Sequence, residues 1–174
     1  MRLFFLILLL ALPASLLVAA EDISSKSPTD KFKILFTRGT DREDYTVKAI
    51  SADNQVLFQA PVDLSVYPNS IIWHKSGDRV AFSAGTHFLM ESYVLSHSPD
   101  GFILSKLPPP EHAWDNFHVI PTKWKGDNLS VAVDGPYAGH ADNGHYSGRM
   151  LIFVPPDPRK AKVLSEQIDQ DKEK

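Results

Sequence analysis

The feature that most constrains the fold is an alternation of apolar and other residues that returns at a nearly constant interval along the chain. Each copy starts two residues after an aspartate, at Asp30, Asp78 or Asp127, so the copies begin 48 and 49 residues apart. Side chains that alternate with period two are typical of strands with one buried face. The alternating apolar positions are Phe32, Ile34 and Phe36, then Val80, Phe82 and Ala84, then Leu129, Val131 and Val133.

Turn-forming residues separate the apolar runs throughout the chain. Asp53-Asn54, Ser76-Gly77-Asp78, Pro99-Asp100-Gly101 and Lys125-Gly126-Asp127 all lie between short apolar segments, where Asp-Gly is a strong hairpin signal. No helical stripe occurs before about residue 160. The sequence therefore predicts an all-β antiparallel meander with three repeats of about four strands, near residues 31–60, 70–107 and 117–165.

One stretch of the second repeat carries a family resemblance. Ile72-Trp73-His74-Lys75-Ser76-Gly77-Asp78-Arg79-Val80-Ala81-Phe82-Ser83, followed by Ser98-Pro99-Asp100-Gly101, resembles the repeat of WD40-like (TolB-type) β-propellers. Trp124-Lys125-Gly126-Asp127-Asn128-Leu129-Ser130-Val131 is similar but shorter at the turn. The first repeat has no matching tryptophan or innermost strand. The resemblance implies blade-like repeats in which Trp73 and Trp124 belong to the core.

The number of repeats leaves the closure of the fold open. Propellers close with typically 4–8 blades, whereas this chain offers about three. Three meanders can form an open assembly, a β-sandwich or a small barrel. Alternatively, blades from a second chain complete a ring, because an incomplete one would leave sheet edges unpaired.

The two ends of the chain differ in composition from the repeats. Arg2 precedes an apolar run from Leu3 to Leu12, and small residues follow at Val18-Ala19-Ala20. This order predicts a signal peptide at 1–20 and export to the periplasm or the medium, with no stable membrane insertion once it is cleaved; retention as an anchor is the alternative. Residues 21–30 are interpreted as a flexible leader and 166–174 as a charged tail.

Composition excludes several classes of function. The 18 Lys and Arg against 21 Asp and Glu give a formal net charge of −3, without the concentrated positive surface that a nucleic-acid partner needs. The absence of cysteine excludes disulfides, thiolate nucleophiles and Cys-ligated metal centres. No G-x-S-x-G elbow and no Gly-rich phosphate loop before a helix is present, so nucleophilic catalysis and nucleotide cofactors find no support.

The segment 134–147 is the first candidate site. It holds His140, Asp142 and His145 between glycines, and imidazole and carboxylate together suit zinc and other divalent transition metals. The spacing matches no named metal motif. A solvated Gly-rich hairpin loop without a metal or any other cofactor is therefore the favoured interpretation, and a metal site is the alternative.

The segment 108–124 is the second candidate site. It combines three consecutive prolines and a fourth at Pro121 with Trp114, Phe117 and His118, and Tyr137 lies in the neighbouring candidate segment. Aromatic side chains on a stiff loop can stack on a sugar or seat a peptide. The competing interpretation is a connection between repeats whose aromatic residues cap the core.

These observations lead to three functional expectations. The first is an exported, non-catalytic binding protein that recognises a protein, small molecule or glycan with the loops at one end of the meanders. The second is a metal-dependent hydrolase that uses the 134–147 segment. The third is a structural subunit that completes a larger β assembly, including one made of copies of itself.

Overall fold

The computed structural model describes residues 22–39, 44–62, 65–111, 116–136 and 145–170. Within these ranges the chain forms thirteen strands and two short 3₁₀ helices, which confirms the predicted all-β class. No helix in this part of the chain is long and apolar enough to cross a membrane. The apolar segment 1–20 lies outside the described residues.

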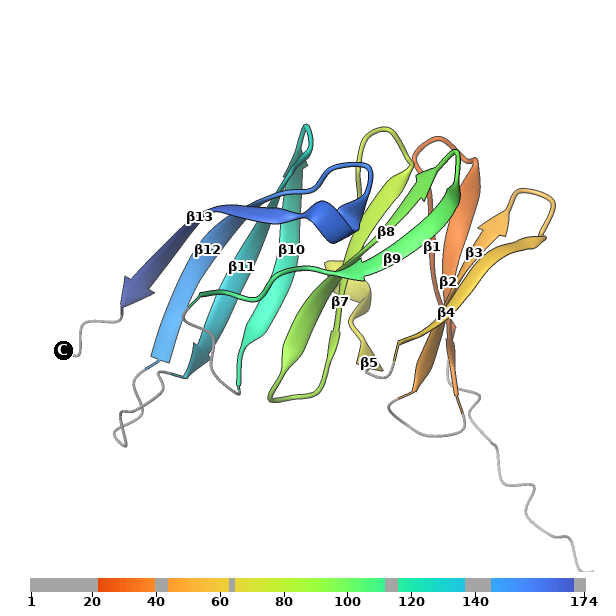
Figure 1. The fold of residues 1–174 in the computed structure, drawn as a ribbon. Coiled ribbons are helices and arrows are strands. Elements are labelled where there is room, and N and C mark those ends of the chain that lie inside the picture. Colours follow the sequence, from red (N-terminus) through yellow and green to blue (C-terminus); the bar gives the residue numbers. More distant parts are fainter. Residues whose placement is uncertain (1–21, 40–43, 63–64, 112–115, 137–144, 171–174) are drawn as a thin grey trace, which may run out of the picture.

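The strands group into three antiparallel meanders of four strands (Figure 1). Meander 1 contains β1 (Ile23–Lys26), β2 (Phe32–Arg38), β3 (Tyr45–Ser51) and β4 (Val56–Val62). Meander 2 contains β6 (Ile72–Trp73), β7 (Arg79–Gly85), β8 (Met90–Ser98) and β9 (Gly101–Lys106). Meander 3 contains β10 (His118–Lys125), β11 (Asn128–Pro136), β12 (His145–Phe153) and β13 (Lys162–Gln170).

Short elements connect these meanders. Strand β5 (Ser65–Val66) also pairs with β7, and the 3₁₀ helix η1 (Pro68–Ser70) separates it from β6. A second 3₁₀ helix, η2 (Pro158–Lys160), precedes β13. Meanders 2 and 3 join through a parallel contact between β8 and β10, at His118 and Met90. The described strands form one four-stranded and one nine-stranded sheet and do not close into a barrel or a ring.

Two strands extend beyond the predicted repeats. Strand β1 lies within the segment 21–30, which the sequence predicts to be a leader, and pairs with β2 from Ile23 to Lys26. The apolar alternation that marks the other strands is missing from β1. Its two inward positions are Ile23 and Ser25, and the partner strand β2 supplies the apolar surface. Strand β13 continues to Gln170, into the segment predicted to be a charged tail.

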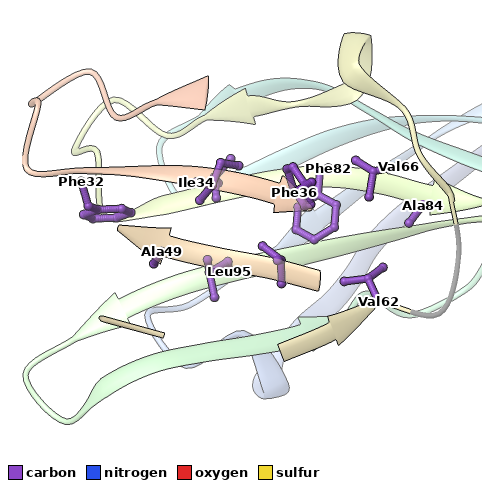
Figure 2. Close-up of a cluster of buried hydrophobic side chains, with 11 residues drawn as sticks. Phe32, Ile34, Phe36, Ala49, Val62, Val66, Phe82, Ala84 and Leu95 are labelled. Carbon is purple, nitrogen blue, oxygen red and sulfur yellow. The ribbon is translucent and has the colours of Figure 1, made fainter. Parts of the chain in front are cut away.

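Two hydrophobic cores lie between the meanders. The first core, between meanders 1 and 2, contains Phe36 and Phe82 with ring centroids 4.9 Å apart (Figure 2). The second core, between meanders 2 and 3, contains Ala81, Val94 and residues of β10, β11 and β12. Each fully buried large apolar side chain contributes about 1.5–3 kcal/mol. Strand β7 is buried at every position because its alternate side chains enter different cores.

The same contacts recur at both junctions between meanders. Trp73 donates its indole N–H to Ser25 Oγ in β1 (2.8 Å), and Trp124 donates its own to the carbonyl of Ile72 in β6 (3.2 Å). Each tryptophan thus bonds to the first strand of the preceding meander. Both rings are half-buried and pack against the cores, as the sequence predicts.

A second recurring contact joins the turns. Ser27, just after β1, donates its hydroxyl to the carbonyl of Gly77 (2.8 Å), and His74, just after β6, bonds through Nε2 to the carbonyl of Gly126 (3.1 Å). Both glycines have positive φ, 72° and 58°, a conformation that favours glycine. Successive meanders are therefore held in one relative position by a tryptophan and a turn residue.

Candidate functional site

The two candidate segments of the sequence meet at one end of the meanders. We call this the loop end; it holds the β7–β8 connection, the start of β10 and the end of β11. Residues 116–118 lie within the 108–124 segment, and Asp134 and Gly135 begin the 134–147 segment; both sets line one cleft of about 160 Å³. The cleft lining consists of His87, Phe88, Asn116, Phe117, His118, Asp134 and Gly135.

Several predicted site residues lie outside this description. Trp114, Tyr137, His140 and Asp142 fall in ranges that the structure does not describe, and His145 is described only as the backbone partner of Pro136 in β12. Among the described residues, no group of three or more His, Asp or Glu side chains is placed to hold a metal ion. Phe117 and His118 are the two predicted ligand-binding residues that the structure brings into the cleft.

His118 lies between two acceptors. Its Nε2 is 3.0 Å from the carbonyl oxygen of His87, and because a carbonyl only accepts, Nε2 carries the proton. Its Nδ1 faces Asp134 Oδ2 at 3.8 Å. His118 and Asp134 are direct cross-strand partners in the β10–β11 ladder, so the two strands set the distance between imidazole and carboxylate.

Phe117 anchors the entry to β10. Its side chain packs against the second core, and its carbonyl accepts the backbone N–H of Met90 at 2.8 Å. The competing interpretation of the sequence, that aromatic residues of this segment cap the core, therefore applies to Phe117. The same residue lines the cleft, so it fixes the wall against which a ligand would rest.

Phe88 projects from a tightly bonded turn. The hydroxyl of Thr86 accepts the backbone N–H groups of Phe88 and Leu89 (both 3.2 Å), and the N–H of Thr86 donates to the carbonyl of Leu89 at 2.7 Å. A side chain at Gly85 would place its Cβ 2.1 Å from that carbonyl, so the turn requires glycine there. The Phe88 side chain is nevertheless 66% exposed. The turn therefore holds an apolar ring in solvent at the edge of the cleft.

The lining combines two imidazoles, one carboxylate and two phenyl rings. The described lining residues include no Ser, Thr, Cys or Lys, and the imidazole of His118 lies between the His87 carbonyl and the Asp134 carboxylate. Formally the lining carries one carboxylate and no Lys or Arg. The sequence analysis did not identify His87 and Phe88, which both line the cleft. The feature that could have indicated them is an aromatic residue in the short connection that follows Gly85.

Comparison with known proteins adds no assignment. A scan against protein-family models finds no match for this chain. A search of the curated proteins likewise finds none.

Proposed function

We propose that the chain is an exported, non-catalytic binding protein whose ligand site is the cleft at the loop end. The observation that supports it is the exposed ring of Phe88 on an ordered turn, beside the His118–Asp134 pair. Exposed aromatic residues next to fixed polar groups are characteristic of interface anchors.

The size of the cleft indicates what enters it. Pockets for whole small ligands typically measure about 300–1,000 Å³, and this cleft measures about 160 Å³. It therefore suits a single side chain that projects from a larger partner. The carboxylate of Asp134 and the face of Phe88 both favour a cation, so we propose a partner protein that inserts a lysine or arginine.

We also propose that the three meanders stack in the manner of propeller blades. The recurring tryptophan and turn contacts support this arrangement. The residues at the free sides of meanders 1 and 3 support a stack that ends there, rather than a ring completed by further blades. Lys26 occupies the place of Trp73 and Trp124 in meander 1, and Lys125 occupies the place of Ser27 and His74 in meander 3; both lysines are exposed. Polar terminal faces are usual where stacked repeats end.

The test compares two exposed apolar residues. Phe88→Ser alters the cleft, whereas Leu164→Ser, on β13 and 54% exposed, is a matched change away from it. Both variants are expected to stay within about 0.5 kcal/mol of the native stability. A partner that cross-links to the purified protein should be lost about tenfold or more with Phe88→Ser and retained with Leu164→Ser.

Two results would contradict the proposal. Equal capture by both variants would place the binding surface elsewhere. Shifts in the amide NMR spectrum at 116–118 and 134–135 on adding Zn²⁺, but none on adding free arginine, would favour the metal-dependent alternative instead.

A further inference from the structure

A second cleft lies in meander 1, at the end of the molecule opposite to the loop end. We call this end of the molecule the turn end, because the short β1–β2, β3–β4, β6–β7, β8–β9 and β10–β11 connections lie there (Figure 1). The cleft measures about 370 Å³, more than twice the volume of the one at the loop end. Its lining consists of Lys26, Asp30, Phe32, Lys33, Ser51, Ala52 and Asn54.

Two hydrogen-bonded turns form its walls. In the β1–β2 turn, Ser27 N–H donates to the carbonyl of Phe32 and Asp30 N–H to that of Ser27, both at 3.0 Å. In the β3–β4 turn, Asn54 N–H donates to the carbonyl of Ser51 at 3.1 Å. Asp30 and Asn54 have positive φ, 54° and 64°. Non-glycine residues with such φ values are uncommon, so each wall has a specific conformation.

Two lysines of neighbouring strands line this cleft. Lys26 of β1 and Lys33 of β2 are direct antiparallel partners, so both side chains lie on the face of the sheet that points away from the first core. Like charges in directly opposite positions destabilise a sheet. The same face carries Lys48 in β3, and no described strand position on it is Asp or Glu. Within the cleft lining, Asp30 is the one carboxylate against two ammonium groups.

The second wall directs a further donor toward the cleft. Lys33 Nζ donates to Asn54 Oδ1 at 3.3 Å. Because the amide oxygen accepts this bond, the amide nitrogen of Asn54 is a second donor on the same rim. Phe32 also borders the cleft, but its ring is buried in the first core, on the other face of the sheet from the two lysines. Paired ammonium groups with an amide donor form a set that recognises oxyanions.

We propose that this cleft binds the phosphate or carboxylate group of a small anionic ligand between Lys26 and Lys33. The anion removes the repulsion between the two lysines and accepts hydrogen bonds from both and from Asn54. The cleft volume exceeds that of a phosphate group alone, so it leaves room for a compact body attached to the anionic group. The site is separate from the proposed partner cleft, which lies at the other end of the molecule.

Titration with inorganic phosphate and phenyl phosphate at constant ionic strength, followed by calorimetry and thermal unfolding, tests the proposal. The wild-type protein should bind both with one saturable site and unfold at a higher temperature in their presence. Lys26→Gln and Lys33→Gln should each weaken binding about tenfold. Lys48→Gln is the matched control, because it removes a lysine from the same face without touching the cleft, and should leave binding within about twofold.

Three outcomes would overturn it. The first is the absence of saturable binding by the wild-type protein. The second is an equal loss in Lys48→Gln, which would indicate diffuse attraction to a positive face. The third is binding to phosphatidylglycerol vesicles without binding of free phosphate, which would assign the face to a membrane surface. In the absence of any anion, Lys26→Gln should unfold at the same or a higher temperature, since it relieves like-charge repulsion.

Discussion

The turn end and the loop end of the molecule are built differently. At the turn end, consecutive strands are joined by short turns, and all the described residues with positive φ lie there, namely Asp30, Asn54, Gly77, Gly101 and Gly126. The hydrogen bonds between the turns of successive meanders are at this end as well. At the loop end, Phe88 is exposed beside the smaller cleft.

The contacts that hold the meanders in order are at the turn end. The turn end fixes the order and spacing of the meanders, so the sequence there is constrained by glycine conformations and buried hydrogen bonds. At the loop end the constraint is local, because the hydrogen-bonded β7–β8 turn requires glycine at Gly85. The two clefts also differ in charge, because Asp134 is the ionic residue of one lining and two lysines dominate the other.

The largest effect is expected at Arg79, which joins meanders 2 and 3 at the turn end. Its side chain is buried, donates to the carbonyl of Val154 and to Asp127 Oδ1 (both 2.6 Å), and lies 5.5 Å from the ring centre of Trp124. Arg79→Met leaves these acceptors without their donor and should lower the free energy of unfolding by about 3 kcal/mol. Urea unfolding measures the change.

Arg79→Lys provides the matched comparison for this prediction. Lysine keeps the charge but not the planar fork that reaches Val154 and Asp127 together, so a loss of about half that of Arg79→Met is expected. A loss below about 1 kcal/mol for Arg79→Met would show that the turn end does not hold the meanders together.

A smaller and paired effect is expected at the two tryptophans. Trp73→Phe and Trp124→Phe each remove one indole hydrogen bond to the preceding meander and part of a half-buried ring. Each should cost about 1.5 kcal/mol, and the two costs should be similar if the junctions are equivalent. Thermal and urea unfolding of both variants measure this. A neutral Trp73→Phe beside a costly Trp124→Phe would break the equivalence, because it would make meander 1 an independent unit.

The predictable part of the fold came from residues that repeat. Period-two runs after Asp30, Asp78 and Asp127 predicted strands that became β2, β7 and β11, and the position of Trp73 and Trp124 predicted their packing. Strand β1 could not be found in this way. Its pairing depends on β2 and on the indole of Trp73 bonding to Ser25, and both are tertiary contacts that a polar tetrapeptide does not encode.

The pair at the loop-end cleft depends on an irregularity in the sheet. Counting outward from the β10–β11 turn pairs Lys125 with Asn128, and without interruption it would place His118 opposite Gly135. A bulge between Pro121 and Lys123 shifts the register by one residue and places His118 opposite Asp134. A one-residue shift changes which side chains share a face. Sequence periodicity indicates neither the bulge nor the approach of the β7–β8 turn that brings Phe88 into the cleft.

The smallest expected effect is a pH dependence of stability that arises at the turn end. At the turn end, burial and the neighbouring Arg79 guanidinium hold the pKa of His74 below its ordinary value of 6.5. The unfolded chain therefore takes up a proton at this residue at a higher pH than the folded chain does, and stability should fall as the pH drops below about 6.5 and level off below the folded pKa. The slope should be well under the ~1.4 kcal/mol per pH unit that one full proton would give.

Urea unfolding between pH 7.5 and 5 measures this dependence. His74→Gln retains an amide donor for the carbonyl of Gly126 but cannot titrate, so its stability should vary less with pH than that of the wild-type protein. A second loss of stability is expected at lower pH. The hydrogen bond from Arg79 holds the pKa of Asp127 below its ordinary value of 3.8, so the stabilisation from this bond is lost only as the pH falls below 3.8. Identical pH profiles for the wild type and His74→Gln would mean that the acid sensitivity arises outside the turn end, and would remove the electrostatic part of the distinction between the two ends.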